Sequence, residues 1–473
     1  MKYDYHIIVI GAGSGGLVAA AGAASLGARV ALVEAEKMGG DCLNYGCVPS
    51  KAFLKSARIA REIGSAGSFG LSASLSNVDI TEVMGRVKNV ISKIEPHDSE
   101  ERFTGLGVDV IRERGVLLDK HTVRAGSREI TGRSIIIATG SRPAVPPIKG
   151  LNDVRYYTNE TVFECTKLPE HLIVLGGGPI GLELGQGFRH LGSEVTIIDF
   201  LPSLFPKDDP EVGPLMEKVF LDDGMKLSLN TKIIECKKNG GGGVVVTVER
   251  DEKTEDIRGD MLLVSLGRSP STGDMGLERA GVKTTDRGYV ITDSSLRTSV
   301  KSVYACGDVV GPYQFTHMAG YQAGIVLRNI ISPFKTKVDY SGVSWSTYTK
   351  PEVAHSGVTE QEAKSRGLLK DTVIVDLKEN DRAITEGSSE GFLKFIIGPG
   401  GKLVGATCVH EKAGEIISLA AFAISRRLKA MSFVNSIFPY PTVAEVYRGA
   451  GMELVKKTFK PWMKKFIKKV FFR

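Results

Sequence analysis

Residues 39–51 read GGDCLNYGCVPSK, and the two cysteines in this stretch guide the interpretation of the whole chain. Residues five apart in an ideal helix lie roughly 8 Å apart at Cα, which exceeds the roughly 7 Å limit for a disulfide. A bond between Cys42 and Cys47 therefore requires a distorted helix, and Gly46 and Pro49 supply backbone irregularity. Because a strained disulfide is easily reduced, and labile disulfides are usually catalytic or regulatory, the stretch predicts a redox-active pair.

Two other roles are open to paired cysteines, namely a structural staple or half of a metal site. A zinc site favours two residues between paired cysteines and further ligands elsewhere, and the sequence shows neither pattern. We therefore predict no resident metal ion and keep redox chemistry as the leading interpretation.

The composition is that of a globular protein with several domains. A chain of 473 residues is too long for one ordinary core, and its hydrophobic and charged fractions are typical of globular proteins. Six cysteines, of which one pair is close in sequence, are not the pattern of a disulfide-stapled secreted protein, so we expect a reducing, cytoplasmic location. No signal peptide precedes the first apolar run, and no apolar run is long enough to span a bilayer.

The net charge of +7 is concentrated at the C-terminus. Residues 456–473 carry eight lysines or arginines and no acid, so the rest of the chain is close to neutral. This distribution argues against a general nucleic-acid surface and indicates a role specific to the C-terminus.

A nucleotide-binding motif begins near the N-terminus. The apolar run Ile7–Ile10 leads into GAGSGG at residues 11–16, an alanine-rich helix follows, and a strand over residues 29–33 ends on Glu34. This is the order of a dinucleotide fold, in which the glycines let the backbone approach a pyrophosphate at a positive helix end. The carboxylate then accepts hydrogen bonds from ribose hydroxyls.

The same pattern repeats later in the chain. A strand over residues 172–175 leads into GGGPIG at residues 176–181, and the strand Glu194–Ile198 ends on Asp199. Asp199 stands at the same distance from Gly176 as Glu34 stands from Gly11. Two such units in one chain predict two bound nucleotides.

Five further stretches complete the organisation of the chain. Residues 134–143 read as a strand that breaks into a turn, and residues 261–270 repeat that pattern in the second unit. Residues 239–243 predict a hairpin turn, and the strand that begins at Val303 ends on Asp308, where a carboxylate is placed to bind a cofactor hydroxyl. From about Val343, alternating strands and an apolar helix over about 413–428 predict a separate α+β domain.

With these features in this order, the chain resembles the class I flavoprotein disulfide reductases, the family of dihydrolipoamide dehydrogenase, glutathione reductase and mercuric reductase. The resemblance covers nearly the whole chain. It implies an α/β fold with two Rossmann-like domains and a C-terminal α+β domain that forms a homodimer. The implied parts are an FAD-binding domain (1–150), an NAD(P)-binding domain (151–272), a central segment returning to the FAD domain (273–340), a dimerisation domain (341–455) and a basic amphipathic tail (456–473).

The resemblance also implies which residues hold FAD. Glu34 and the glycines of the first motif would hold the ADP half, Thr316 would line the cofactor, and Asp308 would meet the ribityl chain. The full predicted set is Gly11, Gly13, Ser14, Gly16, Glu34, Gly40, Asp41, Lys51, Gly115, Ala138, Thr139, Gly140, Asp308 and Thr316.

In the redox centre, the resemblance assigns different roles to the two cysteines. Cys42 matches the interchange thiol that meets the substrate, and Cys47 matches the thiol that lies against the flavin and forms the charge-transfer thiolate. Lys51 and Glu183 match an ion pair beside the flavin ring, where Lys51 would stabilise negative charge on the reduced flavin. The alternative for Lys51 is an ordinary lysine on a helix surface.

The second motif predicts the coenzyme. The implied binding set is Gly176, Gly178, Gly181, Asp199 and Gly267. A carboxylate at Asp199 accepts the 2′-hydroxyl of NAD and repels the 2′-phosphate of NADP, and Phe200-Leu201-Pro202, which follow it, carry no positive charge. We therefore expect NADH as the electron donor in preference to NADPH.

The substrate side departs from the family pattern. Members that reduce organic disulfides carry a His-Pro-Thr motif near the C-terminus, whose histidine, oriented by a glutamate, moves the proton of the interchange thiol. Here Tyr440 takes the place of that histidine, while Glu445 is kept. Tyrosine, with a reference pKa near 10, is a poor general base at neutral pH, so exchange with dithiols such as lipoamide is not favoured.

Tyrosine at this position is similar to mercuric reductase, although two features of that enzyme are missing. The C-terminus has no Cys-Cys pair, and no small cysteine-bearing metal domain precedes Met1. The remaining cysteines are scattered, and we expect Cys165, Cys236, Cys306 and Cys408 to be buried core residues. The prediction is a mercuric-reductase-like enzyme whose acceptor is a metal ion or a disulfide, with dihydrolipoamide dehydrogenase-type activity as the alternative.

The tail is a second, independent clue. From Phe459 onward apolar residues recur at steps of three and four, and the lysines occupy the other face of a predicted amphipathic helix, with Pro461 in its first turn. Such a helix resembles an anchor on anionic lipid at the inner face of a membrane, which would favour a membrane-docked NADH:quinone reductase or redox sensor. The alternative is a helix packed on its own dimer.

Overall fold

The computed structural model describes residues 3–459 and 461–472, and it divides the chain into two compact units. The first unit consists of Met1–Pro202 and Gly224–Val338, and the second of Ser203–Asp223 and Asp339–Arg473. The domain boundaries given above remain predictions. Lys460 and Arg473, two of the basic residues of the tail, lie outside the described residues.

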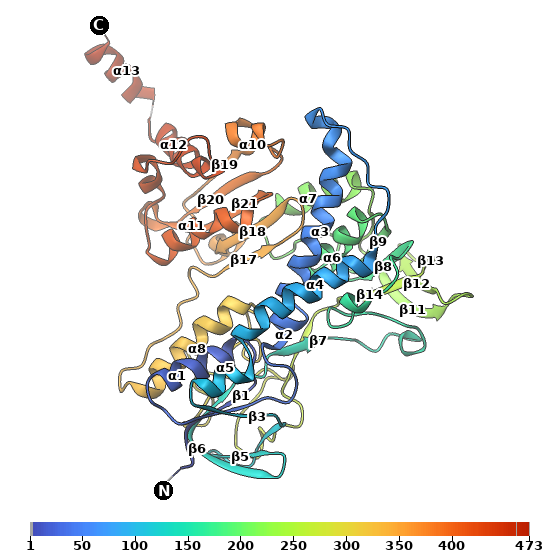
Figure 1. Ribbon diagram of the computed structural model, residues 1–473. Helices are drawn as coiled ribbons and strands as arrows, with labels where there is room; N and C mark the ends of the chain where they lie inside the picture. The colour runs from blue at the N-terminus through green and yellow to red at the C-terminus, as the bar shows by residue number, and fades with distance from the viewer. Residues whose placement is uncertain (1–2, 460, 473) are drawn as a thin grey trace. The chain divides into compact units, whose positions relative to one another are not determined.

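The first unit contains a seven-stranded sheet that begins with the first nucleotide motif (Figure 1). Its strand order is β3-β2-β1-β6-β5-β4, and β16 also pairs with β6. The strands β3, β2, β1, β6 and β16 are parallel neighbours, and their apolar residues are buried on both faces of the sheet, as their continuous apolar runs predict. The bounds are β1 Tyr5–Ile10, β2 Val30–Val33, β3 Val108–Ile111, β4 Gly115–Leu117, β5 Thr122–Ala125, β6 Arg128–Ile137 and β16 Val303–Ala305.

Helices of the first unit cover this sheet and carry the cysteine stretch. Helices α1 and α8 lie side by side, which places the start of α8 beside the first nucleotide motif (Figure 1). Helix α3 packs against both α4 and α6. The bounds are α1 Ser14–Ser25, α2 Gly40–Asn44, α3 Cys47–Ser65, α4 Ile80–Ile94, α5 Glu100–Gly105, α6 Pro179–His190 and α8 Thr316–Ile331, with 3-10 turns at Ala66–Phe69, Glu95–His97, Leu151–Asp153 and Val162–Glu164.

The second nucleotide motif lies in a four-stranded parallel sheet of the same unit, with the order β10-β9-β8-β14. The predicted hairpin turn at 239–243 is confirmed, because Asn239 N–H donates to the Gly243 carbonyl at 2.8 Å between β11 and β12. The bounds are β8 His171–Leu175, β9 Glu194–Ile198, β10 Lys226–Ser228, β14 Met261–Val264, and β11 Lys232–Lys238, β12 Val244–Arg250 and β13 Lys253–Gly259 in an antiparallel sheet.

The two repeated turn stretches pair directly with each other. Strand β7 (Ser141–Pro143) forms the end of the first stretch, and β15 (Arg268–Pro270) forms the end of the second. They form a two-stranded antiparallel sheet in which Ser269 lies opposite Arg142. The pairing joins the ends of the two turn stretches.

The second unit is the predicted α+β fold, built on a five-stranded antiparallel sheet. The predicted apolar helix over 413–428 ends three residues early, at Ser425, because Arg427 adopts a left-handed φ of 55° that closes the helix. The bounds are α7 Val212–Asp222, β17 Ser344–Thr347, β18 Glu352–Gly357, α9 Glu360–Ser365, β19 Asp371–Asp376, α10 Asp381–Thr385, β20 Phe392–Ile397, β21 Leu403–His410, α11 Ala413–Ser425, α12 Val446–Thr458 and α13 Pro461–Phe471, with 3-10 turns at Leu377–Glu379, Pro399–Gly401, Ala430–Asn435 and Val443–Glu445.

A buried ionic cluster holds the segment 203–223 within the second unit. The ammonium of Lys394, in the middle of β20, is fully buried. It lies 2.6 Å from a carboxylate oxygen of Glu360, 2.8 Å from Glu211 and 3.5 Å from Asp209. A buried lysine requires such partners, so these carboxylates are what allow Lys394 to occupy a core position.

Candidate active site

The cysteine stretch forms a broken helix, as the geometry of a close cysteine pair requires. Helix α2 ends at Asn44, Tyr45 and Gly46 leave the helical path, and α3 begins at Cys47. A Cβ on Gly46 would lie 2.8 Å from a carboxylate oxygen of Asp41, so a larger residue here would have to displace that carboxylate. Both Cys42 and Cys47 are free thiols, so the structure has the pair in its reduced form.

The two thiols differ in acidity because one donates a hydrogen bond to the other. The bond from Cys42 is the main reason that the pKa of Cys47 falls to about 6, and the hydroxyl of Thr316 and the charge of Lys51 lower it further. The same bond, together with burial, raises the pKa of Cys42. The two shifts favour Cys47 as the thiolate and Cys42 as the protonated partner.

Thr316 joins the cysteine pair from a position 269 residues further along the chain. Its hydroxyl lies 3.4 Å from the Cys47 sulfur, and it is the first residue of α8. The N-terminus of a 16-residue helix carries partial positive charge, which favours a thiolate at this place.

The predicted ion pair of Lys51 and Glu183 is present between α3 and α6. The Lys51 ammonium lies 2.7 Å from a carboxylate oxygen of Glu183, whose side chain is buried, and it also donates to the Ser50 hydroxyl at 3.2 Å. The charge of Lys51 also lowers the pKa of Cys47, which places the ammonium near the thiolate.

In the first glycine motif, Gly13 faces open space, whereas Gly11 and Gly16 pack closely against backbone atoms. Gly11 has φ 103°, and a Cβ there would lie 2.5 Å from the Ala138 carbonyl oxygen, while a Cβ on Gly16 would lie 1.8 Å from the Gly11 carbonyl oxygen. A Cβ on Gly13, the N-cap of α1, would meet no atom closer than the Cα of Gly40 at 4.0 Å. The helix end around Gly13 and Ser14 is thus accessible to a phosphate group.

Glu34 is held at the edge of this motif. Its carboxylate accepts hydrogen bonds from the backbone N–H of Ala12 at 2.5 Å and of Glu36 at 2.7 Å. Gly40, with φ 58°, lies against Gly13, so the start of the cysteine stretch touches the glycine turn. Gly115 is buried, and a Cβ there would meet the Ile10 side chain at 2.9 Å, which gives this glycine a packing role.

The second glycine motif repeats the arrangement of the first. A Cβ on Gly176 would lie 2.5 Å from the Ser265 carbonyl oxygen, and one on Gly181 would lie 2.1 Å from the Gly176 carbonyl oxygen. Gly178, the N-cap of α6, has nothing within 4 Å of its Cβ direction. Asp199 accepts hydrogen bonds from the backbone N–H of Gly177 and, at 2.8 Å, of Leu201.

A polar network connects the predicted ribityl contact to the cysteine stretch. Asp308 accepts a hydrogen bond from the Ser141 hydroxyl at 2.5 Å, and burial raises the pKa of Asp308. Arg268 donates to the same hydroxyl at 2.7 Å and lies 3.3 Å from Asp41. Sequence reasoning missed Ser141 and Arg268, although each follows directly on the glycine of a repeated turn stretch, which was the signal available.

The remaining residues predicted for FAD leave room for a ligand. Thr139 has a buried hydroxyl without a hydrogen-bond partner among the described residues. A Cβ on Gly140, with φ 68°, would meet nothing within 4 Å, and the same holds for Gly267, with φ 121°, which is predicted for NAD. An unpaired buried hydroxyl beside open glycine backbones fits a polar cofactor, so the residues present are consistent with FAD.

Tyr440 and Glu445 belong to the second unit. The hydroxyl of Tyr440, which is exposed, donates to a carboxylate oxygen of Asp381 at 3.0 Å, and this bond raises its pKa above the ordinary value. Glu445 accepts a hydrogen bond from the Thr442 N–H at 3.3 Å as part of a capping box. Its carboxylate therefore stabilises the start of a helical turn.

The other cysteines are buried, as predicted. Burial raises the pKa of Cys165 and Cys236 to about 11, that of Cys306 to about 12, and that of Cys408 further still. Within residues 3–459 and 461–472, no three His, Cys, Asp or Glu side chains are grouped so that they could hold a metal ion.

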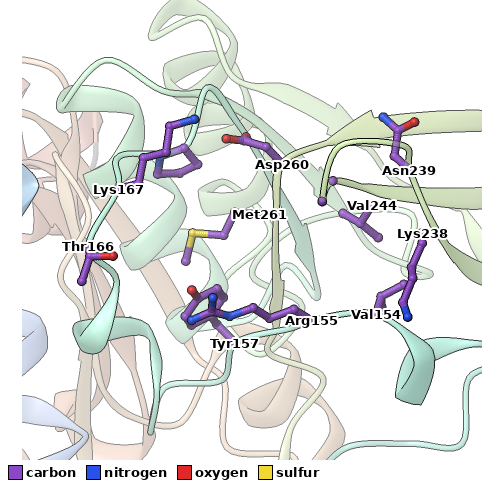
Figure 2. A pocket seen from close by; sticks show the side chains of 13 residues that line it. Val154, Arg155, Tyr157, Thr166, Lys167, Lys238, Asn239, Val244, Asp260 and Met261 are labelled. Carbon is purple, nitrogen blue, oxygen red and sulfur yellow. The ribbon is translucent and has the colours of Figure 1, made fainter.

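A cavity of about 420 Å³ lies elsewhere in the first unit, between β14 and the antiparallel sheet. Figure 2 shows Arg155, Tyr157 and Met261 on one side of it and Asn239 on the other. None of the residues predicted for NAD or FAD lines this cavity. It is therefore separate from the candidate site.

Comparison with known proteins finds two family descriptions that match this chain. The first, pyridine nucleotide-disulphide oxidoreductase, matches residues 5–323. The second, the dimerisation domain of pyridine nucleotide-disulphide oxidoreductases, matches residues 343–450.

Individual relatives cover almost the whole chain. A mercuric reductase from Staphylococcus aureus is 35% identical over 457 residues, which are 96% of this chain and 82% of the relative. A dihydrolipoyl dehydrogenase from Thermus scotoductus is 34% identical over 463 residues, which are 96% of this chain and 98% of the relative.

Solved structures resemble the fold closely. LpdA from Mycobacterium tuberculosis has a TM-score of 0.87 at 26% identity, covering 95% of this chain and 99% of that chain. A Cu(II) complex of the HOCl-induced flavoprotein disulfide reductase RclA from Escherichia coli has a TM-score of 0.84 at 26% identity, covering 95% of this chain and 100% of that chain.

Proposed function

Because the chain belongs to the pyridine nucleotide-disulphide oxidoreductase family, we propose that it passes electrons from NADH through FAD to the Cys42–Cys47 disulfide and on to a soft metal ion. The chain is thus an NAD(P)H-dependent flavoprotein disulfide oxidoreductase. The match to the dimerisation domain supports a homodimer. The choice of acceptor has to be argued from residues of this chain, since the relatives carry different names.

The choice of a metal ion as the acceptor rests on the protonation state of Tyr440. Reducing a disulfide to two thiols consumes two electrons and two protons, so the site needs a group that delivers protons. Reducing a divalent metal ion to the element consumes two electrons and no proton. Tyr440 has a raised pKa and already donates its proton to Asp381, so it is a poor proton carrier at neutral pH.

The unequal thiols fit the same reaction. Cys47 is poised as the thiolate, held by the hydrogen bonds of Cys42 and Thr316. Cys42 keeps its proton until an acceptor arrives, and a soft cation displaces that proton because the thiolate is the metal ligand. In the balanced reaction, NADH and the divalent ion give NAD⁺, the reduced metal and one proton.

The cofactors are assigned to the two glycine motifs. The ends of α1 and α6, opened by Gly13 and Gly178, would bind the pyrophosphates of FAD and NADH. Glu34 and Asp199 would each accept hydrogen bonds from a ribose. FAD supplies a two-electron carrier between the nicotinamide and the cysteine pair. The role of Lys51 is to hold positive charge beside that carrier, with Glu183 fixing its position.

The proposal is tested by following NADH oxidation with a panel of acceptors under anaerobic conditions. The panel contains Hg(II) in excess thiol, Cu(II), lipoamide and glutathione disulfide. We expect turnover with a metal ion, its loss in Cys42→Ser, and slow turnover with both disulfides. Faster turnover with a disulfide than with any metal ion would contradict the choice of acceptor, and turnover that survives in Cys42→Ser would contradict the role of the pair.

Dihydrolipoamide dehydrogenase-type activity is the second candidate, and Glu445 favours it because the residue that orients the proton-carrying histidine is still present. This candidate predicts that wild type oxidises dihydrolipoamide and that Tyr440→His accelerates the reaction. Tyr440→Phe is the matched control, because it removes the hydroxyl without adding a base. Equal, near-zero rates in all three proteins would exclude this candidate.

A further inference from the structure

The C-terminal helix α13 divides lengthwise into an apolar half and a basic half. With about 100° of rotation per residue, its apolar residues fill an arc of roughly 180° and its lysines fill the opposite arc. The apolar arc consists of Trp462, Met463, Phe466, Ile467, Val470 and Phe471, and the basic arc of Lys464, Lys465, Lys468 and Lys469. Residues of the two kinds do not intermix around the helix.

The apolar half of α13 is open to solvent. Trp462 is 64% exposed, Phe466 57% and Phe471 72%, and no described residue of the helix is buried. A continuous exposed stripe that includes three aromatic side chains requires a partner, since isolated apolar residues on a surface do not line up in this way. The helix is attached directly after α12, through residues 459 and 460.

The charge distribution of α13 indicates which kind of partner the helix binds. The helix has no acidic residue, and its lysines form one continuous arc, so a second copy of the helix is repelled and an anionic surface is attracted. A nucleic acid would pair with the lysines but would leave the aromatic half in water. An anionic lipid surface satisfies both halves, because the aromatic side chains enter the interface while the lysines reach the headgroups.

The length of α13 determines how the helix is oriented relative to a membrane. Eleven residues extend about 16 Å, roughly half of what is needed to cross the hydrocarbon layer. No helix among residues 3–459 and 461–472 is long and apolar enough to span a membrane. A helix of this length and division therefore lies in the plane of the interface.

We propose that α13 docks the protein on the surface of a membrane containing anionic lipid. The inference does not depend on which acceptor the cysteine pair reduces. In a dimer two such helices act together, so docking of the whole protein is stronger than that of one helix.

Co-sedimentation with vesicles tests the proposal on the full-length, FAD-loaded protein. The vesicles are phosphatidylcholine alone or phosphatidylcholine with phosphatidylglycerol, and the comparison chain is truncated after Phe459, which leaves α12 complete. We expect the full chain to pellet with the anionic vesicles only and the truncated chain to stay in solution. Equal pelleting of both chains, or equal binding to neutral vesicles, would overturn the proposal.

Matched variants separate the two halves of the helix. Phe466→Ser should weaken binding, whereas Phe69→Ser, which removes a phenylalanine of almost equal exposure, 58%, outside the tail, should not. The double variant Lys465→Gln/Lys468→Gln should lower partitioning about 25-fold for each helix that contacts the membrane, at about fivefold for each lysine. The charge-preserving Lys465→Arg/Lys468→Arg should bind as wild type does. Bound-flavin absorption in every variant verifies that the protein is folded.

Tryptophan fluorescence distinguishes lipid from the other partners. The chain has two tryptophans, and Trp345 is half-buried in the second unit. We expect a blue shift on adding anionic vesicles that is absent in Trp462→Phe. A blue shift that needs no lipid and disappears on dilution would show that the helix binds a second copy, and binding to duplex DNA that Phe466→Ser leaves unchanged would show a nucleic-acid site. Either result would overturn the proposal.

Discussion

Replacing Cys42 tests whether its hydrogen bond makes Cys47 a thiolate. Cys42→Ala removes the donor, and Cys42→Ser keeps a hydroxyl in the same place, so the two variants differ mainly in this bond. Neither variant can form the disulfide, so Cys47 is a thiol in both. The comparison therefore isolates the largest of the causes that lower the pKa of Cys47.

The expected magnitude follows from the strength of a hydrogen bond to a charged group, about 1.5–3 kcal/mol. One pH unit of pKa corresponds to about 1.4 kcal/mol, so losing the bond raises the pKa by about one to two pH units. From about 6 in the native pair, the pKa of Cys47 should rise to about 7–8 in Cys42→Ala. In Cys42→Ser it should stay within about half a pH unit of the native value, because the hydroxyl still donates.

The assay is a pH titration of the long-wavelength absorption that a thiolate gives beside oxidised FAD. Because Cys47 loses its proton as pH rises, the band should be absent well below the pKa and complete above it. The rate of iodoacetamide alkylation of Cys47 supplies an independent titration of the same group. Coincident midpoints for the alanine and serine variants would refute the role of the Cys42 bond.

Three other substitutions test separate parts of the structure. Lys51→Met should raise the pKa of Cys47 by less than Cys42→Ala does, since the charge of Lys51 is a weaker cause, and a larger rise in the same titration would reverse that order. Asp199→Asn should lower kcat/KM for NADH about tenfold and leave kcat/KM for NADPH unchanged or higher, because it removes a hydrogen-bond acceptor for the ribose and a charge that repels the 2′-phosphate. Steady-state kinetics with both coenzymes measures the effect, and an equal fall for both would count against the assignment of Asp199 to the ribose. Lys394→Met should lower the free energy of unfolding by about 3 kcal/mol, because it leaves the fully buried carboxylate of Asp209 without its cation. Urea unfolding measures the loss, and an unchanged midpoint would contradict this role of Lys394.

The parts of the site that follow from local sequence were predictable. A strand, a glycine turn and a helix position one another through neighbouring residues, which is why Gly11 and Gly176 have nearly equal left-handed φ angles of 103° and 106°. The break between α2 and α3 was likewise predictable from the distance that a cysteine pair must span.

The parts that depend on long-range contacts were not predictable from residue patterns. Thr316 reaches Cys47 across 269 positions, and only the family resemblance indicated that it lies near the cofactor. Lys394 lies within the apolar stretch FLKFII, where its charge alone would favour contact with solvent. It is buried because Glu211, 183 positions away, pairs with it, and no pattern near either residue shows this.

The choice between a metal ion and a disulfide as acceptor depends on Tyr440. The local sequence shows that a tyrosine stands at this position, and the structure shows which group it contacts. Tyr440 was recognised as a departure from the histidine of the family pattern. The bond to Asp381 is a contact across 59 positions that explains why the phenol keeps its proton. Without that contact the phenol could be assigned either to proton transfer or to binding.

The central claim, that electrons from NADH reach the Cys42–Cys47 pair, is tested most directly by anaerobic titration of the FAD-loaded enzyme with NADH. The first equivalent of NADH should produce the long-wavelength thiolate band while the FAD stays oxidised. In Cys42→Ser, which has no disulfide to reduce, the first equivalent should bleach the flavin directly. If the first equivalent bleaches the wild-type flavin and no such band appears, electrons from NADH do not reach the cysteine pair.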